Sequence, residues 1–480
     1  MNSKTVFRVE RHSNKVAQTF LSVPKIPQRS GTSSKIVKTG TDRNVCATLA
    51  RRASQKPVHD LTTEPLEKVR VGIIGLGKRN TRHLRDLLRI PFVEIGAVCD
   101  VQQANINEAV ALCAAKKQKP TSYSGNERAW EKLIAQDNID VVYIATPWEW
   151  HCEMSVKSME AGKHAFVEVP AALTIEECWK LVDTAERTRR HCVMLENCCY
   201  GADELLVLNM ARQGVFGTLV HAECGYKHDM RERLFDLDRE GAWRREYHKR
   251  LNGNFYPTHG LGPVAQYLGI GRGDQFTHLV SMSSREAGLS EWLAEQKPNG
   301  GRHARERYAC GDMNTTLIRT AQGRTIMLQH DVVNPLPYSR VNALCGTHGI
   351  FRSYPARLAL DAPQKYGLKT ADSHKHDHNW LPDADFKKMR RRFEHPLQTR
   401  LGKLAKDSGH GGMNYVMSRR LLDCIRQGIT PDITAYDAAA WSSIIELSCQ
   451  SVAQRSAPVD VPDFTRGAWK TIKPLGIVTA

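Results

Sequence analysis

The residues of this chain best suited to chemistry stand directly after short apolar segments. Thr146-Pro-Trp-Glu-Trp-His151 follows one such segment, Glu168-Val-Pro170 follows the next, and Glu196-Asn197 with Tyr200 follows the last. Carboxylates, an imidazole and a phenol are side chains that take up and release protons in enzymes. The two tryptophans offer flat surfaces to a ligand, although a packed corner of the fold is the alternative. These segments indicate a site for an organic ligand.

A glycine-rich turn, Gly75-Leu-Gly77-Lys-Arg-Asn80, adds a second kind of chemistry. Gly75 permits a tight turn, Gly77 lets the backbone approach a pyrophosphate, and the helix that follows supplies N–H donors for its charge. Asn80 stands where such motifs usually have a third glycine. Asp100 is placed to accept hydrogen bonds from ribose hydroxyls, and its charge favours NAD over the 2′-phosphorylated relative. A glycine turn beside a surface aspartate is the alternative.

The elements that must position these residues alternate between strands and helices. Thr81–Ile90 has helical spacing, and Thr174–Arg189 begins with a capping box in which Glu177 is the second member. The expected strands are Val69–Ile74, Val93–Cys99, Val141–Ala145, Ala165–Val167 and Cys192–Leu195. This rhythm predicts a doubly wound parallel sheet, a Rossmann domain over residues 68–200, with its ligand beyond the carboxyl ends of the strands.

The pattern changes after about Tyr200, where residues alternate between apolar and polar. Thr315–Thr320, Arg324–His330 and Val341–Leu344 have this period of two. We therefore expect a second domain of the α+β class over residues 201–480, with a mainly antiparallel sheet. Ala438–Ala453 has the spacing of a helix that could pack back on either domain.

The net charge of +17 over 480 residues is concentrated at the start of the chain. Residues 1–60 carry twelve Lys and Arg against three Asp and Glu, whereas the rest carries 56 against 48, an ordinary balance for an enzyme. No basic stripe with interleaved aromatic residues indicates nucleic acid. Residues 1–67 read as a basic, disordered extension, with a transit-like segment or a misassigned start as alternatives.

Compartment and metal binding follow from cysteine and histidine spacing. The thirteen cysteines include no Cys-x-x-Cys pair, which favours a reducing compartment such as the cytoplasm and gives no zinc site. His374-Lys-His376-Asp-His378 is expected to be a solvated loop, so we predict no metal. No apolar stretch approaches the roughly 18 residues that a membrane-spanning helix needs.

These blocks resemble the glucose–fructose oxidoreductase and inositol dehydrogenase superfamily, which joins a Rossmann domain to an open antiparallel sheet. Its members commonly have Glu-Lys-Pro where this chain has Glu168-Val169-Pro170. The longer blocks, including Asn252–Pro263 and Gly409–Met413, are more similar to glycoside hydrolase family 109. That family implies α-N-acetylgalactosaminidase activity with NAD that is bound but not consumed. It usually has Gly at position 80 and Asp at position 414, where this chain has Asn.

The resemblance also implies roles for individual residues. Besides Gly75 and Gly77, the cofactor contacts would be Arg79, Asn80, Asp100, Trp148, Glu149, Trp150, His151, Glu168, Val169 and Asn197. The sugar contacts would be Tyr226, Arg244, Tyr256, Pro257, Thr258, His259 and Tyr338, with Tyr256 also near the nicotinamide. A second copy of the chain would pack on the exposed face of the sheet.

Family 109 chemistry explains why a hydrolase would carry a nicotinamide site. A hydride leaves C3 of the sugar for NAD, the new ketone acidifies the C2 proton, the group at C1 is eliminated, water adds, and the hydride returns to C3. His259 is the first candidate for a base, because neutral imidazole is competent near pH 7. Tyr256 and Tyr200 are the next candidates, and each would need a nearby positive charge.

Two alternatives remain open. An NAD-dependent sugar or polyol dehydrogenase would share the nucleotide features, but Val169 in place of lysine argues against it. A non-catalytic protein that binds sugar and nucleotide would keep the fold without turnover. The hydrolase would act on a glycan or a small-molecule glycoside, whereas the dehydrogenase would act on a free sugar or a polyol.

Overall fold

The computed structural model describes residues 50–52, 55–236, 241–296, 303, 305–368 and 379–477. All of them belong to one compact unit that begins at Asp42. Residues 1–49, 53 and 54 of the extension predicted at 1–67, like the His374 to His378 cluster, lie outside the described residues. The described part of that extension is attached to the folded unit, because Val58 and Leu61 are buried and Arg51 pairs with Glu186 at 2.9 Å.

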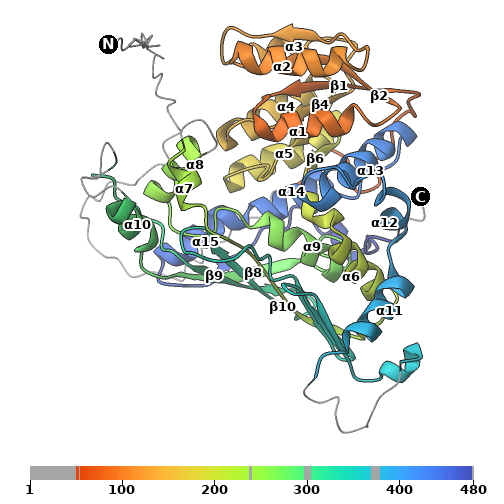
Figure 1. Cartoon of the computed structure of the whole chain (residues 1–480), viewed down its shortest axis with the longest axis vertical. Helices are drawn as coiled ribbons and strands as arrows, with labels where there is room; N and C mark the ends of the chain where they lie inside the picture. Colours follow the sequence, from red (N-terminus) through yellow and green to blue (C-terminus); the bar gives the residue numbers. More distant parts are fainter. Residues whose placement is uncertain are drawn as a thin grey trace, which may run out of the picture. The chain divides into compact units, whose positions relative to one another are not determined.

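The first sheet has six parallel strands in the order β3-β2-β1-β4-β5-β6 (Figure 1). They are β1 (Val69–Ile74), β2 (Val93–Cys99), β3 (Thr121–Tyr123), β4 (Val141–Ile144), β5 (His164–Val167) and β6 (Cys192–Met194). The helices of this part are α1 (Lys78–Leu87), α2 (Gln103–Ala114), α3 (Trp130–Ile134), α4 (His151–Glu160) and α5 (Ile175–Thr188). This order confirms the predicted doubly wound fold. Successive strands are added on one side of β1 up to β3 and on the other side from β4 onward, and such folds bind their ligands at this switch point between β1 and β4.

Local chemistry explains where these helices begin. Thr174 Oγ1 accepts a hydrogen bond from the Glu177 N–H at 3.1 Å, so the cap predicted for α5 is present. Helix α1 begins at Lys78, three residues before the predicted start, because Asn80 already belongs to its first turn. The Asn80 amide donates to the carbonyl oxygens of Ile74 and Gly75 at 3.1 and 2.6 Å. This side chain therefore ties the end of β1 to the start of α1.

The second sheet has eight strands in the order β13-β12-β11-β7-β10-β9-β8-β14. They are β7 (Leu219–Lys227), β8 (Phe276–Ser283), β9 (Asn314–Thr320), β10 (Thr325–Asp331), β11 (Ala343–Gly346), β12 (Gly349–Arg352), β13 (Arg357–Leu360) and β14 (Val459–Asp460). The pair β7 and β10 is parallel and the other pairs are antiparallel, which confirms a mainly antiparallel sheet. The expected strands at 315–320, 324–330 and 341–344 correspond to β9, β10 and β11.

Helix α9 (Thr258–Leu268) lies on this sheet and carries the first catalytic candidate, His259. A Cβ at Gly260 would stand 2.5 Å from the backbone nitrogen of Gly225 in β7, so two glycines permit the close approach of helix and strand. The other helices here are α6 (Ala202–Arg212), α7 (Arg231–Leu234), α8 (Gly241–Arg250), α10 (Gly288–Gln296), α11 (Asp383–Phe393) and α12 (Pro396–Leu401). Two neighbouring glycine backbones thus fix His259 relative to the sheet.

Three C-terminal helices, α13 (Met413–Gln427), α14 (Ala435–Ser442) and α15 (Ile444–Ala453), connect the two sheets (Figure 1). The single helix predicted at 438–453 is two helices that meet at Ser443. Ser442 Oγ accepts from the Ala171 N–H at 3.2 Å on the Rossmann side, and Ser451 Oγ accepts from the Ser281 N–H at 2.8 Å in β8. The segment therefore contacts both parts.

Within the described part of the chain, no helix combines the length and apolar character needed to cross a membrane. The twelve cysteines placed in that part are free thiols.

Candidate active site

The nucleotide end of the site lies where β1 and β4 diverge. Gly75 has φ +79°, and a Cβ there would stand 2.6 Å from the carbonyl oxygen of Ala145 at the end of β4. At Gly77, by contrast, a Cβ would meet nothing within 4 Å among the described residues. Gly77 is also the N-cap of α1, whose first turn has no acidic residue. Gly75 thus permits the close approach of β4, and Gly77 leaves open space beside a helix N-terminus, which fits a pyrophosphate.

Asp100 is held at the mouth of this turn. Its Oδ2 accepts from the Leu76 N–H at 2.5 Å, and its Oδ1 accepts from the Gln102 N–H at 2.7 Å and the Asn105 amide at 3.2 Å. Oδ1 thus already accepts two hydrogen bonds, whereas Oδ2 has a lone pair left for a further donor. An aspartate fixed in this position fits the hydroxyl groups of a ribose.

Two of the expected cofactor residues direct their side chains into the protein instead. Asn80 binds the carbonyls already named, and His151 places its ring nitrogens 2.7 Å from Pro170 O and 2.9 Å from Thr146 O. His151 therefore joins the loops that follow β4 and β5. Burial lowers its pKa. These two residues shape the loops around the nucleotide rather than offering it a free side chain.

Glu168 forms a buried ionic group with two residues of α1. Its Oε1 lies 2.5 Å from Arg79 Nε and 2.7 Å from His83 Nε2. Burial alone would raise the pKa of Glu168, but the charge of Arg79 and the contact with His83 hold it below its usual range. Val169 follows with a buried side chain and donates its N–H to Glu168 Oε2 at 3.2 Å. Glu168 is therefore an anion at neutral pH.

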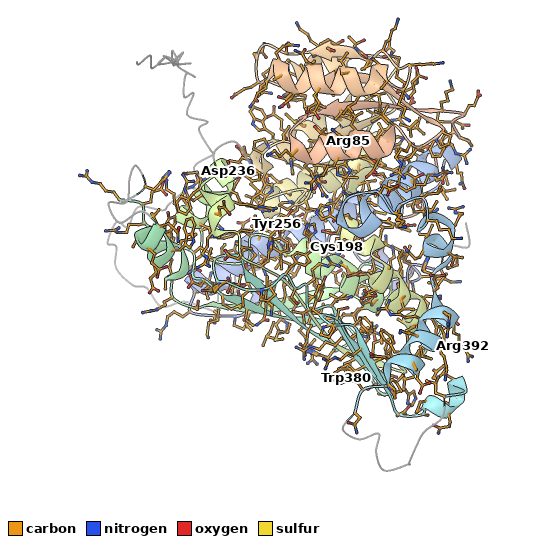
Figure 2. The ribbon with its side chains drawn as sticks, in the orientation of Figure 1. Arg85, Cys198, Asp236, Tyr256, Trp380 and Arg392 are labelled. Carbon is orange, nitrogen blue, oxygen red and sulfur yellow. The ribbon has the colours of Figure 1, made fainter. Side chains whose placement is uncertain are left out.

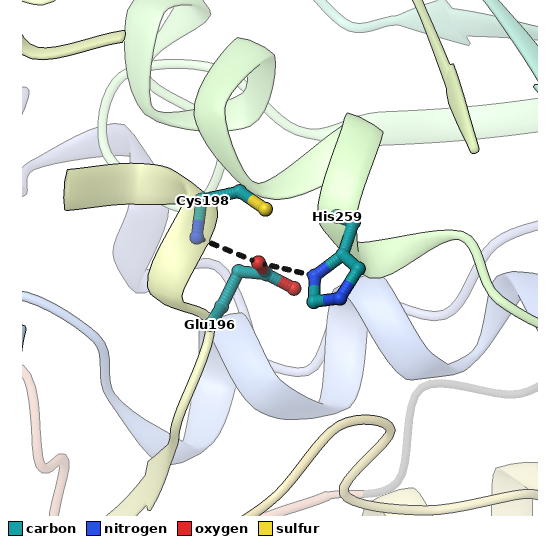
Figure 3. A group of neighbouring side chains, drawn as sticks. All are labelled: Glu196, Cys198 and His259. Atoms are coloured by element: carbon teal, nitrogen blue, oxygen red, sulfur yellow. Dashed lines mark hydrogen bonds and ion pairs between the residues drawn. The ribbon is translucent and has the colours of Figure 1, made fainter. Parts of the chain in front are cut away.

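The centre of the site is a contact between the end of the Rossmann sheet and the first turn of α9. Glu196 Oε1 lies 2.7 Å from His259 Nδ1 and accepts from the Cys198 N–H at 3.0 Å (Figure 3). Burial alone would raise the pKa of Glu196, but His259 lowers it below its usual value. Because the carboxylate holds a proton on Nδ1, the other ring nitrogen, Nε2, is the basic atom of neutral His259.

The ligand atoms of Glu196, Cys198 and His259 lie within 4.8 Å of one another, a spacing that a metal ion could use. Burial raises the pKa of the Cys198 thiol well above its ordinary value, so the sulfur stays protonated. The carboxylate and imidazole of this group also suit proton transfer, and the expected absence of a metal stays a prediction.

Aromatic rings and one arginine surround His259. The ring centroid of Tyr256 lies 4.9 Å from that of His259, and Tyr226 lies at 5.4 Å. Trp148 stacks on Tyr256 at 5.6 Å, and the buried Arg244 guanidinium stands 4.4 Å from the Tyr256 centroid. Figure 2 shows Tyr256 between the two sheets. This box joins a base, a phenol and a fixed positive charge.

The remaining residues predicted to bind sugar or to act as a base are Pro257, Thr258, Tyr338 and Tyr200. Pro257 is the N-cap of α9 and Thr258 its first, buried residue. Tyr338 packs edge-on to Tyr226 at 6.2 Å. Tyr200, in contrast, directs its buried hydroxyl to Asp432 at 3.2 Å, and burial together with Asp432 raises its pKa well above the ordinary value. The structure thus does not bring the Tyr200 hydroxyl to the His259 group.

Three cofactor candidates are engaged with other parts of the chain. Glu149 Oε2 accepts from the Tyr247 hydroxyl at 3.3 Å, the Arg128 guanidinium lies 5.4 Å from the Trp150 ring, and the Asn197 amide donates to Asn414 Oδ1 at 2.8 Å. These contacts fix the loops that follow β4 and β6.

His410 was not predicted as a site residue, although its Gly-His-Gly-Gly-Met block was noted. Its Nδ1 lies 3.4 Å from Arg79 Nη1 and 3.3 Å from the amide nitrogen of Asn414. Burial, with the charges of Arg79 and His259, lowers the pKa of His410 to about 4. His83 was also missed. Its spacing of four residues from Arg79 on one helix was the available signal.

The two halves of the chain match two protein families. Residues 69–196 match the oxidoreductase family with an NAD-binding Rossmann fold, and residues 200–471 match the C-terminal domain of glycosyl hydrolase 109. The class is therefore an enzyme built on an NAD-binding oxidoreductase fold, with NAD as its cofactor.

Curated relatives narrow the class to one family. A glycosyl hydrolase family 109 protein of Shewanella sp. (strain W3-18-1) is 48% identical over 428 residues, which cover 88% of this chain and 91% of the relative. A protein of Shewanella oneidensis named alpha-N-acetylgalactosaminidase is 46% identical over 440 residues, covering 91% and 94%. The chain belongs to glycosyl hydrolase family 109 and is an NAD-dependent glycoside hydrolase, as the sequence blocks indicated.

Solved structures share the fold at low identity. Levoglucosan dehydrogenase in complex with NADH and L-sorbose superposes with a TM-score of 0.60 at 18% identity, covering 83% of this chain and all of that chain. A scyllo-inositol dehydrogenase from Lactobacillus casei gives a TM-score of 0.55 at 13% identity, covering 83% and 99%.

Proposed function

We propose that this enzyme hydrolyses terminal α-N-acetylgalactosaminides, or a closely related α-glycoside, by transient oxidation of the sugar at C3. The observation that carries the proposal is the pairing of His259 with the buried Glu196 inside a box of aromatic rings. The relative named alpha-N-acetylgalactosaminidase supports the choice of sugar.

The carboxylates of the site argue against direct displacement. That mechanism needs a pair of carboxyl groups, one of which keeps its proton because its pKa is raised. Glu168 and Glu196 both have lowered pKa values and both are held by cationic or donor groups. Neither is suited to protonate a leaving group, which favours a stepwise path.

Bound NAD would supply a hydride acceptor, and later a hydride donor, for C3 of the sugar. Asp100 and the first turn of α1, which includes Arg79, would hold it, and the open space at Gly77 and the position of Asp100 support this. His259 Nε2 would take the proton of the C3 hydroxyl, because Glu196 keeps Nδ1 protonated. The ketone at C3 then acidifies the proton at C2.

Tyr256 would take the C2 proton. Its ring packs against His259 and lies under the Arg244 guanidinium, whose charge stabilises negative charge on the phenolic oxygen. Loss of the group at C1 gives an unsaturated ketone, and addition of water to it followed by reduction at C3 completes a cycle with no net oxidation. Tyr200 has no role in this proposal, since its hydroxyl faces Asp432.

The division of labour belongs to the same proposal. Residues 68–200 would bind the nucleotide and residues 201–480 the sugar, and the family matches at 69–196 and 200–471 support these boundaries.

Stoichiometry tests the function. Purified enzyme with trace NAD is incubated with the para-nitrophenyl α-glycoside of N-acetylgalactosamine, while nitrophenol and reduced cofactor are followed together. We expect many nitrophenols per NAD without accumulation of reduced cofactor. Steady reduction of the cofactor by free sugars or polyols, with no nitrophenol, would instead make the protein a dehydrogenase.

A further inference from the structure

A cavity of about 370 Å³ lies beside the site and has no role in the steps above. Its wall includes Glu204 from α6, Arg340 from the segment before β11, Ser353 and Tyr354 from the segment after β12, and His410. The volume is within the range of sites that hold small organic molecules. It is therefore large enough for a ligand group.

The cavity borders the site on two sides. Tyr338 packs against Tyr226 of the site at 6.2 Å and against Tyr354 of the cavity at 6.0 Å. On the other side, His410 lines the cavity and contacts Arg79 at 3.4 Å. A substrate with its sugar at His259 could thus extend into the cavity.

The surface of the cavity is aromatic and polar at once. Tyr354 in the wall is 41% exposed and Tyr338 beside it is 42% exposed, and the Arg340 guanidinium lies 5.7 Å from the centroid of each ring. Exposed tyrosines flanked by fixed hydrogen-bonding groups suit a pyranose ring, whose C–H face packs on an aromatic ring while its hydroxyls bind polar atoms.

The charges of the wall are balanced. Arg340 binds Glu204 and also donates to the Tyr338 hydroxyl at 2.9 Å, while Asp203 pairs with Arg390 at 2.6 Å. The low pKa of His410, about 4, leaves that ring neutral at pH 7. A neutral polyol fits this wall better than an anion does.

The backbone around the cavity is strained. Val341, Asn342, Tyr354 and His410 all have left-handed φ values, between +42° and +64°. A β-branched residue such as Val341 is rarely found there. Such strain persists where the surroundings enforce it, and it is concentrated at functional sites.

We propose that this cavity binds the leaving group of the substrate when that group is a sugar, and that Tyr354 is a specificity-determining residue that packs on its ring. The proposal rests on the proposed function, because it places the cleaved sugar at His259. The enzyme would then prefer N-acetylgalactosamine that is α-linked to another sugar over the same residue on a small alcohol.

Two substrates with the same cleaved sugar test this preference. The first is a disaccharide of N-acetylgalactosamine α-linked to a hexose, and the second is the methyl α-glycoside. Free N-acetylgalactosamine is measured for both, with wild type, Tyr354→Ala and Tyr354→Phe. The ratio of the two kcat/KM values should fall about tenfold in Tyr354→Ala. In Tyr354→Phe, which keeps the ring, it should stay within about twofold of wild type.

Both variants keep a Cβ, so the strain at φ +64° is not altered by the test. An unchanged ratio in a Tyr354→Ala protein with wild-type Tm overturns the proposal. With a serine-linked glycopeptide as a third substrate, a loss in Tyr354→Ala that is confined to this compound assigns the cavity to a peptide and also overturns the proposal.

Binding separates this proposal from the proposed function. Calorimetry with the disaccharide and the methyl glycoside is performed on NAD-loaded His259→Ala, with and without Tyr354→Ala. Tighter binding of the disaccharide that depends on Tyr354 supports the cavity proposal. This holds even if wild type cleaves neither compound, a result that would contradict only the proposed hydrolysis. Equal binding of the two compounds overturns the cavity proposal while leaving hydrolysis to be judged from turnover.

Discussion

His259 Nδ1 and Glu196 Oε1 lie 2.7 Å apart, although the two residues belong to different parts of the fold. Glu196 follows β6 of the Rossmann sheet, and His259 is in the first turn of α9 on the antiparallel sheet. The packing of the two parts against each other therefore sets the orientation of His259, the proposed base. We therefore expect Glu196 to act as a positioning residue for His259.

Glu196→Gln tests that role. The amide keeps the size of the side chain but loses the charge that holds the His259 tautomer, so we expect kcat to fall by about 10²-fold, the scale of one proton-transfer group. NAD affinity and Tm should stay near wild type. Turnover and calorimetry on the same preparation measure these quantities. Full activity in Glu196→Gln would show that the contact is only structural.

Asp100→Asn tests the ribose contact. The amide oxygen can still accept from Leu76, but the charge that favours the ribose hydroxyls is lost. We expect NAD affinity to fall roughly tenfold or more, and discrimination against the 2′-phosphorylated cofactor to weaken. Fluorescence titration with both dinucleotides measures this. Unchanged affinity for both would place the ribose elsewhere.

Gly77→Ala and Gly260→Ala form a matched pair. A methyl at Gly77 meets open space within the described protein, so the apo protein should keep its Tm while NAD binds at least tenfold more weakly. A methyl at Gly260 meets the backbone of Gly225, so stability should fall by about 1–3 kcal/mol. Thermal unfolding with and without NAD separates the two effects. Equal changes in Tm and in NAD binding for the two variants would contradict the assignment of Gly77 to the pyrophosphate and of Gly260 to the packing of α9.

The buried histidines set the acid stability. Burial lowers the pKa of His395 to about 4, and its neutral Nδ1 accepts from the Leu397 N–H at 3.1 Å as the cap of α12. The unfolded chain binds the proton near pH 6.5, so this residue destabilises the fold as the pH falls from about 6.5 to 4. His395→Asn keeps a capping group without titration.

Between pH 7 and pH 5, the free energy of unfolding of His395→Asn should therefore fall by about 1–2 kcal/mol less than that of wild type. Urea unfolding at the two pH values measures the difference, with exposed His278→Asn as the control. If the free energy of unfolding of His395→Asn changed with pH as that of wild type does, this account of the loss of stability at acid pH would be contradicted.

The sequence predicted the elements that have strong apolar patterns. Val141–Ile144 is buried along its whole length and was recognised, whereas β3, Thr121–Tyr123, is an edge strand with no buried residue and was not. The two C-terminal helices were taken as one because the apolar spacing continues through their junction at Ser443. Local patterns therefore indicated which segments are strands but not where one helix ends and the next begins.

The site was predicted as separate segments rather than as contacts. The strand ends pointed to Glu168 and Glu196, but the pairing of Glu168 with Arg79 depends on how α1 packs against the sheet. The pairing of Glu196 with His259 depends on how the two parts of the fold meet. His410 reaches Arg79 only through the turn before α13. Such long-range contacts leave no periodic signal in one sequence. The second copy expected on the sheet face stays a prediction.

The most direct test of the central claim is hydrolysis in D2O followed by NMR of the released N-acetylgalactosamine. Removal of the C2 proton during the cycle predicts deuterium at C2 of the product, because water supplies the proton that returns there. Tyr256→Phe should lose this turnover while still binding NAD. Rapid release of a product that keeps its original hydrogen at C2 would contradict elimination and point to direct displacement at C1.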